Sequence, residues 1–209
     1  IETLERKAEL TESPEERAQI KHEAADVLRS QLDDSERAAE LFREILDSAP
    51  ADERALAALE EIYRTAKDWI AVQEILVRSR DADPENLEIL FRLAELAEVA
   101  LDDPSDASER YREVLTIEAG NRRAQDGLET VLHKEERWHD LVEVLQTRSE
   151  YAADQGDGSG EIALLVRIAR LWAEQLDDAD AAADVLEKVL EREPENIGAL
   201  TELARLYEL

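Results

Sequence analysis

The chain has 209 residues, of which 44% are hydrophobic and 37% charged, and its 53 acidic and 25 basic residues give a net charge of −28. The hydrophobic fraction is sufficient for a folded core, whereas the acidic surface disfavours binding to the nucleic acid backbone. No hydrophobic run approaches the ~20 residues of a membrane-spanning helix, so we expect no membrane insertion. The lack of cysteine excludes thiolate chemistry, and 3 histidines are too few for a histidine-rich metal site.

Residues that favour helix formation dominate the chain. Alanine and leucine are abundant, glycine and proline number only 6 and 5, and the apolar alternation of strands is rare. The prolines fall between the apolar-periodic stretches, where they punctuate short connections. The sequence therefore predicts an all-α protein of about 12 helices, at residues 1–10, 15–32, 36–48, 52–67, 69–82, 86–101, 105–118, 121–136, 138–153, 161–176, 180–192 and 196–209.

The connections carry recognisable capping residues. Ser35 and Ser105 are predicted N-caps, and Asp177 with Asp178 could cap the helix at 180. One connection is different, because residues 154–160 contain three glycines and are predicted to form a flexible loop.

The chain repeats itself. The string Leu-Asp-Asp occurs at residues 32–34, 101–103 and 176–178, with spacings of 69 and 75, and Trp69 and Trp138 are also 69 apart. The glycine-rich segment accounts for the six extra residues. Apolar residues recur at the same spacings: Ala25, Ala94 and Ala169; Phe42, Tyr111 and Leu186; Leu46, Leu115 and Leu190; Leu59, Leu128 and Leu203. The unit is therefore a superrepeat of about 70 residues, or two helical hairpins.

A hairpin of about 34 residues resembles the tetratricopeptide repeat. The second helix of that family carries an alanine, an aromatic residue and a following proline, as do Ala38, Phe42 and Pro50. Its first helix carries spaced leucines, a small residue and a tyrosine, the pattern of Leu200, Leu203, Ala204 and Tyr207. The repeats are divergent: Glu60 replaces a small residue, Gln125 an apolar one and Ala119 the proline.

The resemblance implies a right-handed α-solenoid of stacked antiparallel hairpins. We expect residues 1–209 to form a single repeat array, part of a larger protein, whose terminal repeats are truncated. Ile1 and Leu4 lie in the second helix of a hairpin, and Leu203 to Leu209 lie in a first helix that no further helix covers. The end of the array could therefore continue or pair with another chain, including end-to-end self-association. The compartment stays open, with the cytoplasm slightly favoured.

In that family the first helix of each hairpin lines a concave groove. Carried over by position, this gives 30 groove-facing residues, the last two of which are Glu208 and Leu209. Seven of the 30 are basic and 8 are acidic, so the groove is close to neutral and the rest of the chain holds most of the acidic residues. The residues predicted to bind a peptide there are Arg54, Arg64, Phe91, Arg123, His133, Lys134, Arg170 and Arg205.

These features predict a non-enzymatic scaffold that binds segments of partner proteins on its concave surface and organises a multiprotein complex. No catalytic residue, cofactor or metal is expected. The sharper hypothesis is that the arginines line a groove that binds an acidic peptide or a C-terminal carboxylate. The alternative is that they form ordinary ion pairs on solvated helix faces. Two other roles stay open: an architectural or self-assembling spacer without a peptide ligand, and the regulatory or docking arm of an enzyme whose catalytic domain lies outside this chain. The acidic exterior serves solubility or attracts a basic partner.

Overall fold

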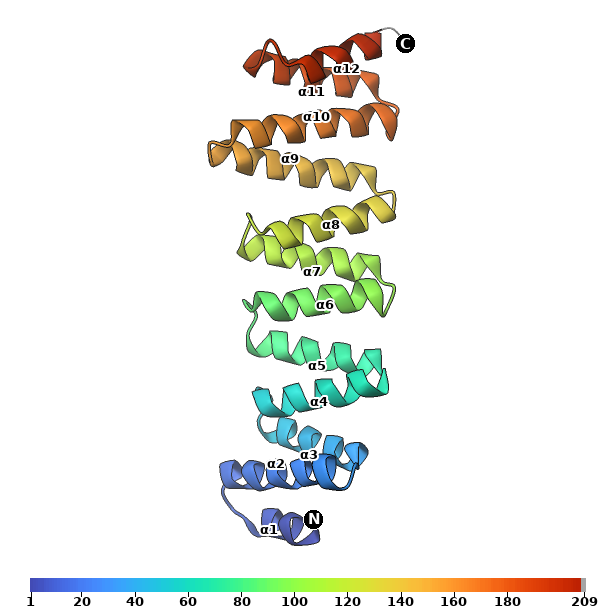
Figure 1. Cartoon of the computed structure of the whole chain (residues 1–209). Helices are drawn as coiled ribbons and strands as arrows, with labels where there is room; N and C mark the ends of the chain where they lie inside the picture. Colours follow the sequence, from blue (N-terminus) through green and yellow to red (C-terminus); the bar gives the residue numbers. More distant parts are fainter. Residues whose placement is uncertain (208–209) are drawn as a thin grey trace. The chain divides into compact units, whose positions relative to one another are not determined.

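The structure, a computed structural model, describes residues 1–207, and these residues form twelve α-helices and no strand (Figure 1). The all-α prediction is confirmed, and the predicted helix boundaries agree to within one turn. The helices are α1 (Glu2–Leu10), α2 (Pro14–Gln31), α3 (Ser35–Ser48), α4 (Glu53–Ala66), α5 (Trp69–Ala82), α6 (Leu87–Val99), α7 (Pro104–Ile117), α8 (Arg122–Lys134), α9 (Trp138–Asp154), α10 (Gly158–Glu174), α11 (Ala179–Arg192) and α12 (Ile197–Tyr207).

The chain forms two compact units, and the boundary falls between Asp103 and Pro104. The first unit contains α1 to α6 and the second contains α7 to α12. Within each unit, consecutive helices pack as antiparallel neighbours joined by short connections (Figure 1). The architecture is therefore an all-α helical-repeat solenoid, and within each unit every helix packs its apolar face against its neighbours in the chain.

The repeated apolar positions make the core. Ala25 and Ala94 are fully buried, and Ala169 is nearly so. An alanine at this position lets neighbouring helices approach closely, and larger side chains such as Phe42 fill the space beside them. The sequence periodicity thus identified the residues that hold each unit together.

Every Leu-Asp-Asp string forms the same turn. Asp33, Asp102 and Asp177 have φ values of 52°, 51° and 53°, in the left-handed region. In the first and third strings the next aspartate caps the following helix: a carboxylate oxygen of Asp34 accepts the amide of Arg37 at 3.1 Å, and Asp178 does the same for Ala181 at 2.9 Å.

Two predicted caps are wrong, and one is confirmed. Ser35 is the first residue of α3 rather than its cap, because Asp34 takes that role. Ser105 lies inside α7, which begins at Pro104, a residue suited to the first helical position because it has no amide to satisfy. Asp178 caps α11 as predicted.

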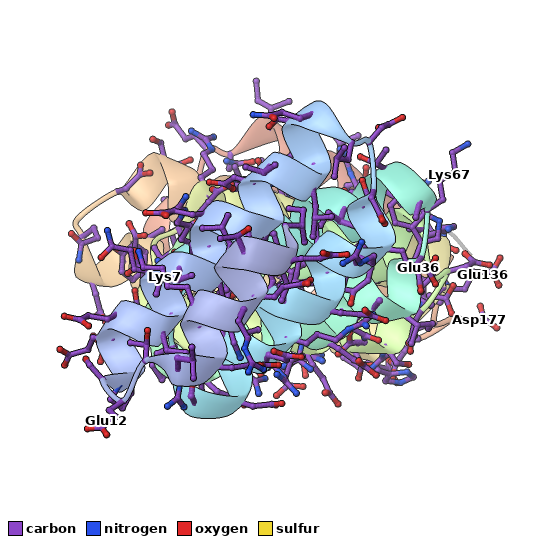
Figure 2. The ribbon with its side chains drawn as sticks, turned by 90° about the horizontal axis from the view of Figure 1, so that it is seen from below. Lys7, Glu12, Glu36, Lys67, Glu136 and Asp177 are labelled. Carbon is purple, nitrogen blue, oxygen red and sulfur yellow. The ribbon has the colours of Figure 1, made fainter. Side chains whose placement is uncertain are left out.

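A second kind of turn also recurs at a spacing of 69 residues. Lys67 and Glu136 have φ values of 58° and 55°, and each lies two residues before a tryptophan that opens the next helix. Figure 2 shows the side chains of Lys67, Glu136 and Asp177 directed away from the ribbon. Backbone geometry therefore repeats along the chain together with the side-chain pattern.

The glycine-rich segment is not the flexible loop that we predicted. Helix α9 continues to Asp154, and α10 already begins at Gly158, so residues 155–157 alone connect them. The side chain of Asp157 accepts the amide of Gly160 at 2.9 Å and the hydroxyl of Ser159 at 3.0 Å. This cap satisfies donors of the first turn, which offsets the low helix propensity of glycine there.

Candidate functional site

The helices predicted to line the groove, here called the inner helices, are α2, α4 and α6 in the first unit and α8, α10 and α12 in the second. Ion pairs join consecutive inner helices of the first unit. Arg29 Nη2 lies 2.6 Å from Glu61 Oε2, and Arg54 pairs with Asp26. The predicted binding residue Arg54 therefore already has a carboxylate partner.

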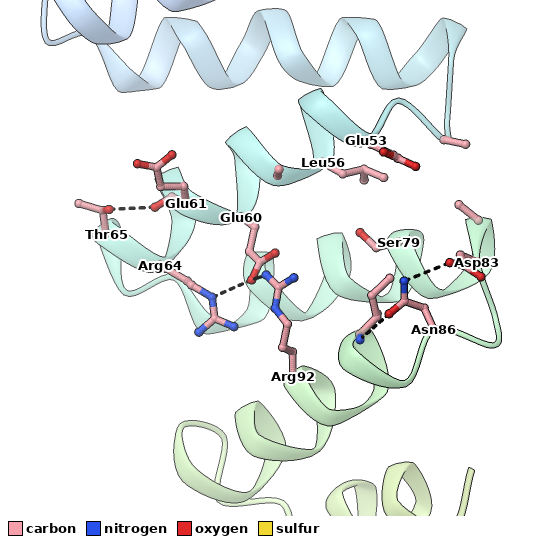
Figure 3. Close-up of a pocket in the computed structure, with 14 residues that line it drawn as sticks. Glu53, Leu56, Glu60, Glu61, Arg64, Thr65, Ser79, Asp83, Asn86 and Arg92 are labelled. Carbon is pink, nitrogen blue, oxygen red and sulfur yellow. Dashed lines mark hydrogen bonds and ion pairs between the residues drawn. The ribbon is translucent and has the colours of Figure 1, made fainter. Parts of the chain in front are cut away.

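A buried carboxylate lies at the centre of the inner face of the first unit. Glu60 is 5% exposed, and its Oε1 lies 2.8 Å from Arg64 Nε and also pairs with Arg92 (Figure 3). Burial lowers the pKa of Arg92 from its ordinary value. One carboxylate thus fixes two guanidinium groups from neighbouring inner helices.

A cavity of about 600 Å³ opens beside this cluster, between α4, α6 and the end of α5. Leu56 and Ile89 provide apolar wall, and Ser79 and Ala82 are small enough to leave the space empty (Figure 3). Four carboxylates line it against two guanidinium groups, so the cavity is acidic on balance: Glu53, Glu60, Glu61, Asp83, Arg64 and Arg92. We refer to this cavity as the α4/α6 groove.

The other predicted binding residues differ in their surroundings. Phe91 is 4% exposed and belongs to the core, so it offers no surface to a peptide. Arg170 lies 3.4 Å from Glu202, and Arg205 lies 3.1 Å from Glu174, so both pair between α10 and α12.

The three predicted residues on α8 are exposed. The His133 ring lies edge-on to Trp138, with ring centroids 5.0 Å apart. Arg123 and Lys134 also take part in interactions within the chain. Two further predicted groove positions, Glu208 and Leu209, lie outside the described residues.

Sequence reasoning missed the ion-pair clusters that centre on Glu60 and Glu129. Glu129 of α8 repeats Glu60 after 69 residues and Arg167 of α10 repeats Arg92 after 75, the same two spacings as Leu-Asp-Asp. Glu129 Oε2 lies 2.7 Å from Arg167 Nη2, and Glu129 Oε1 pairs with Arg148. The spacing of acid and arginine could have identified both clusters from the sequence.

The groove is open in the first unit because of two small side chains. The equivalents of Ser79 and Ala82, 69 residues later, are Arg148 and Tyr151. Arg148 pairs with Glu129 in the second unit, and larger side chains therefore stand where the first unit has space. The sequence-predicted Arg64 is the one predicted residue that lines the α4/α6 groove.

A buried histidine supports one end of the inner face. His22 Nε2 lies 3.1 Å from Asp52 Oδ2, and Asp52 caps α4 by accepting the amide of Ala55 at 2.8 Å. Burial raises the pKa of Asp52, but the Ala55 amide and the His22 ring outweigh it and hold that pKa below its ordinary value of 3.8. Among residues 1–207, His22 Nδ1 has no hydrogen-bond partner.

No helix within residues 1–207 has the length and apolar content needed to cross a membrane. Over the same residues, no three acidic or histidine side chains converge as a metal site would require.

Comparison with known proteins confirms the repeat class. Residues 163–196, from α10 to the start of α12, match the tetratricopeptide repeat family model. No curated protein sequence is significantly similar to the chain.

Several solved structures resemble the chain. The structure of Naa15/Naa10 bound to HypK-THB is 17% identical with a TM-score of 0.52, over 92% of this chain and 34% of that one. MamA is 18% identical with a TM-score of 0.46, over 85% of this chain and 92% of its own. YrrB, described as a TPR protein with an unusual peptide-binding site, is 16% identical with a TM-score of 0.44, over 88% and 91%. At these identities the likeness concerns the fold.

These findings define the class of the protein. It is an all-α helical-repeat protein, and one of its segments, residues 163–196, matches the tetratricopeptide repeat model. Proteins of this class are in general non-catalytic scaffolds for protein–protein interactions.

Proposed function

We propose that this chain is a non-enzymatic scaffold that binds a segment of a partner protein in the α4/α6 groove. The observation that supports this most is the groove itself, about 600 Å³ of space on the inner helices. It combines apolar wall from Leu56 and Ile89 with charged side chains, the composition expected of a site that both buries and orients a ligand.

We further propose that the bound segment carries basic side chains. Arg64 and Arg92 are neutralised in part by Glu60, whereas the carboxylates of Glu53 and Asp83 face the groove without an ion pair among residues 1–207. A lysine or arginine of the partner would compensate this excess of negative charge. The net charge of −28 would also steer a basic partner toward the protein. An acidic ligand, the sharper hypothesis from the sequence, would meet carboxylates here.

Binding in the α4/α6 groove can be tested with a residue that the second unit carries at the equivalent position. Ala82→Tyr introduces the residue that stands 69 positions later, and its ring fills the space beside Leu56. We expect Ala82→Tyr to lower the affinity for a fluorescent lysine-rich peptide by roughly tenfold, which is the effect of losing one good contact. The peptide's affinity is measured by anisotropy titration at low and physiological salt.

The matched control is Asp81→Tyr, which adds the same ring on the exposed neighbouring position outside the groove and should change affinity little. Arg64→Glu should raise the affinity for the lysine-rich peptide. Arg123→Glu, in the other unit, should leave that affinity nearly unchanged. Preferential binding of a glutamate-rich peptide that Arg64→Glu abolishes would contradict our proposal and support an anion receptor.

A second candidate role is self-assembly, and the exposed face of α12 favours it. Ile197, Leu200 and Tyr207 are 79%, 46% and 70% exposed. The equivalents of Leu200 and Tyr207 in α4 are Leu56 and Tyr63, which are buried. We propose that a second copy of the chain covers this apolar face, and that residues 1–209 act as one array in such an assembly.

A further inference from the structure

We propose that the second unit carries an additional binding site, on the side of α7 and α9, for an apolar side chain of a partner segment that is accompanied by a carboxylate. A cavity of about 320 Å³ lies there between α7, α9 and the first turn of α8. Its lining includes Leu115, Leu128 and Val144, which supply an apolar floor. This site shares no lining residue with the α4/α6 groove, so it stands apart from the function proposed above.

The cavity exists because the second unit departs from the repeat. Gln125 and Ala119 line it, and their equivalents 69 residues earlier are Leu56 and Pro50, which are bulkier apolar residues. Tyr151 forms another wall, and its ring lies against Gly120, where a Cβ would come within 2.5 Å of the tyrosine hydroxyl oxygen. The glycine therefore allows the ring position that shapes the site.

A buried amide in the wall retains unused hydrogen-bonding capacity. Gln125 is 7% exposed, and its Nε2 donates to the Ala119 carbonyl oxygen at 2.9 Å, which fixes the orientation of the amide. Within residues 1–207, its Oε1 accepts no hydrogen bond. This oxygen is not among the buried atoms that lack a partner, so a donor from solvent or from a ligand can reach it.

An arginine on the same wall lacks a counterion. The equivalent arginine of the first unit, Arg43, donates to Tyr63 Oη at 2.8 Å and lies over that ring. In the second unit the tyrosine is replaced by Leu132, and the guanidinium of Arg112 pairs with no carboxylate among residues 1–207. A half-buried, uncompensated guanidinium beside an apolar floor recognises an apolar group that carries a carboxylate nearby.

The exposed rim determines which kind of occupant fits. Thr116, Glu143, Thr147 and Tyr151 on the rim are solvent-exposed, so the cavity opens along one side. Small-molecule sites bury most of the ligand surface, whereas an open cavity of this size suits one large side chain projecting from a partner backbone. The occupant is therefore a phenylalanine or leucine of a partner segment, with a glutamate or aspartate next to it that reaches Arg112 and a backbone amide that donates to Gln125.

The test uses the full chain and two short probes, the amidated, N-acetylated dipeptides Phe-Glu and Phe-Lys. Titration by ¹H–¹⁵N NMR should perturb the side-chain amide of Gln125 and the backbone amides of Val144 and Thr147, with an affinity in the high micromolar to millimolar range for so small a probe. The Phe-Glu probe should bind several-fold more tightly than Phe-Lys. Arg112→Gln should remove this preference and keep the weaker apolar binding.

Two variants separate occupancy of the cavity from surface adsorption. Thr147→Trp places a ring over the cavity and should abolish the perturbations at Gln125 and Val144. Gln146→Trp, on an exposed neighbour outside the cavity, should leave them intact. The inference is overturned if millimolar Phe-Glu perturbs none of these amides, if Thr147→Trp and Gln146→Trp respond alike, or if the two probes bind equally to the unmodified chain.

Discussion

The left-handed turn residues are the clearest local strain in the molecule. The five non-glycine residues with positive φ among residues 1–207 are Asp33, Lys67, Asp102, Glu136 and Asp177. For an L-residue the left-handed conformation is roughly 1–2 kcal/mol less favourable than the right-handed helical one. Aspartate tolerates the left-handed conformation better than lysine or glutamate does. The strain is therefore greatest at Lys67 and Glu136.

Replacing Lys67 by glycine should stabilise the protein. Glycine adopts φ near 58° without steric conflict, so we expect Lys67→Gly to raise the free energy of unfolding by about 0.5–1 kcal/mol. Urea denaturation followed by circular dichroism measures the change. Asp33→Gly should give a smaller gain and Lys67→Val a loss, and a loss in Lys67→Gly would show that the lysine makes a compensating interaction.

The capping residue Asp52 should make part of the stability depend on pH. Its pKa is held below 3.8 in the folded protein, so its contribution is fully present above the unfolded pKa near 3.8 and is lost as the pH falls through the lower folded value. Asp52→Asn keeps a capping side chain but does not titrate. The stability difference between the two proteins, measured by urea denaturation, should therefore be larger at pH 6 than at pH 3. A difference that is constant with pH would contradict the role given to Asp52.

At the scale of the helices, the apolar pattern of the sequence predicted the buried residues, whereas the charged residues did not predict the binding site. The apolar period placed Ala25, Leu59 and Leu128 correctly because burial is decided by the face of a helix, which the spacing specifies. The groove could not be placed in this way. Arg54 is occupied by Asp26 of α2, and Arg64 shares Glu60 of its own helix with Arg92 of α6. Which arginine is available to a ligand therefore depends on how neighbouring inner helices pack.

The start of α10 shows how one side chain decides an element. The composition of residues 154–160 indicates a loop, yet the carboxylate of Asp157 caps a helix that begins with two glycines in three residues. We expect Asp157→Ala to destabilise the protein by about 1 kcal/mol and to fray the first turn of α10. Hydrogen exchange of the amides of Gly160 and Glu161 measures the fraying. Unchanged protection there would mean that tertiary packing, rather than the cap, holds this turn.

At the scale of the whole molecule, charge and the apolar face of α12 oppose each other. The net charge of −28 keeps copies apart, whereas Ile197, Leu200 and Tyr207 favour association. Because salt screens the repulsion over a Debye length of ~8 Å at physiological ionic strength, self-association should increase with salt.

Light scattering at rising protein and salt concentrations tests this role. The average mass should increase with both, and Leu200→Glu should abolish the increase by placing a charge on the apolar face. Gly198→Glu adds the same charge at an exposed position on another side of α12, so it is the matched control and should still associate. A mass that stays at 23.7 kDa under all conditions would exclude self-assembly through α12.

The matching Leu-Asp-Asp turns have a consequence for engineering. Residues 34–102 start immediately after one left-handed aspartate and finish on the next, so the residue before each junction of this cassette has nearly the same φ, 52° at Asp33 and 51° at Asp102. In a tandem duplicate spliced in after Asp102, Asp34 of the added copy would again follow a left-handed aspartate and could cap its helix as it does in the parent chain. The protein is thus modular in the practical sense that its length can be edited without designing a new junction.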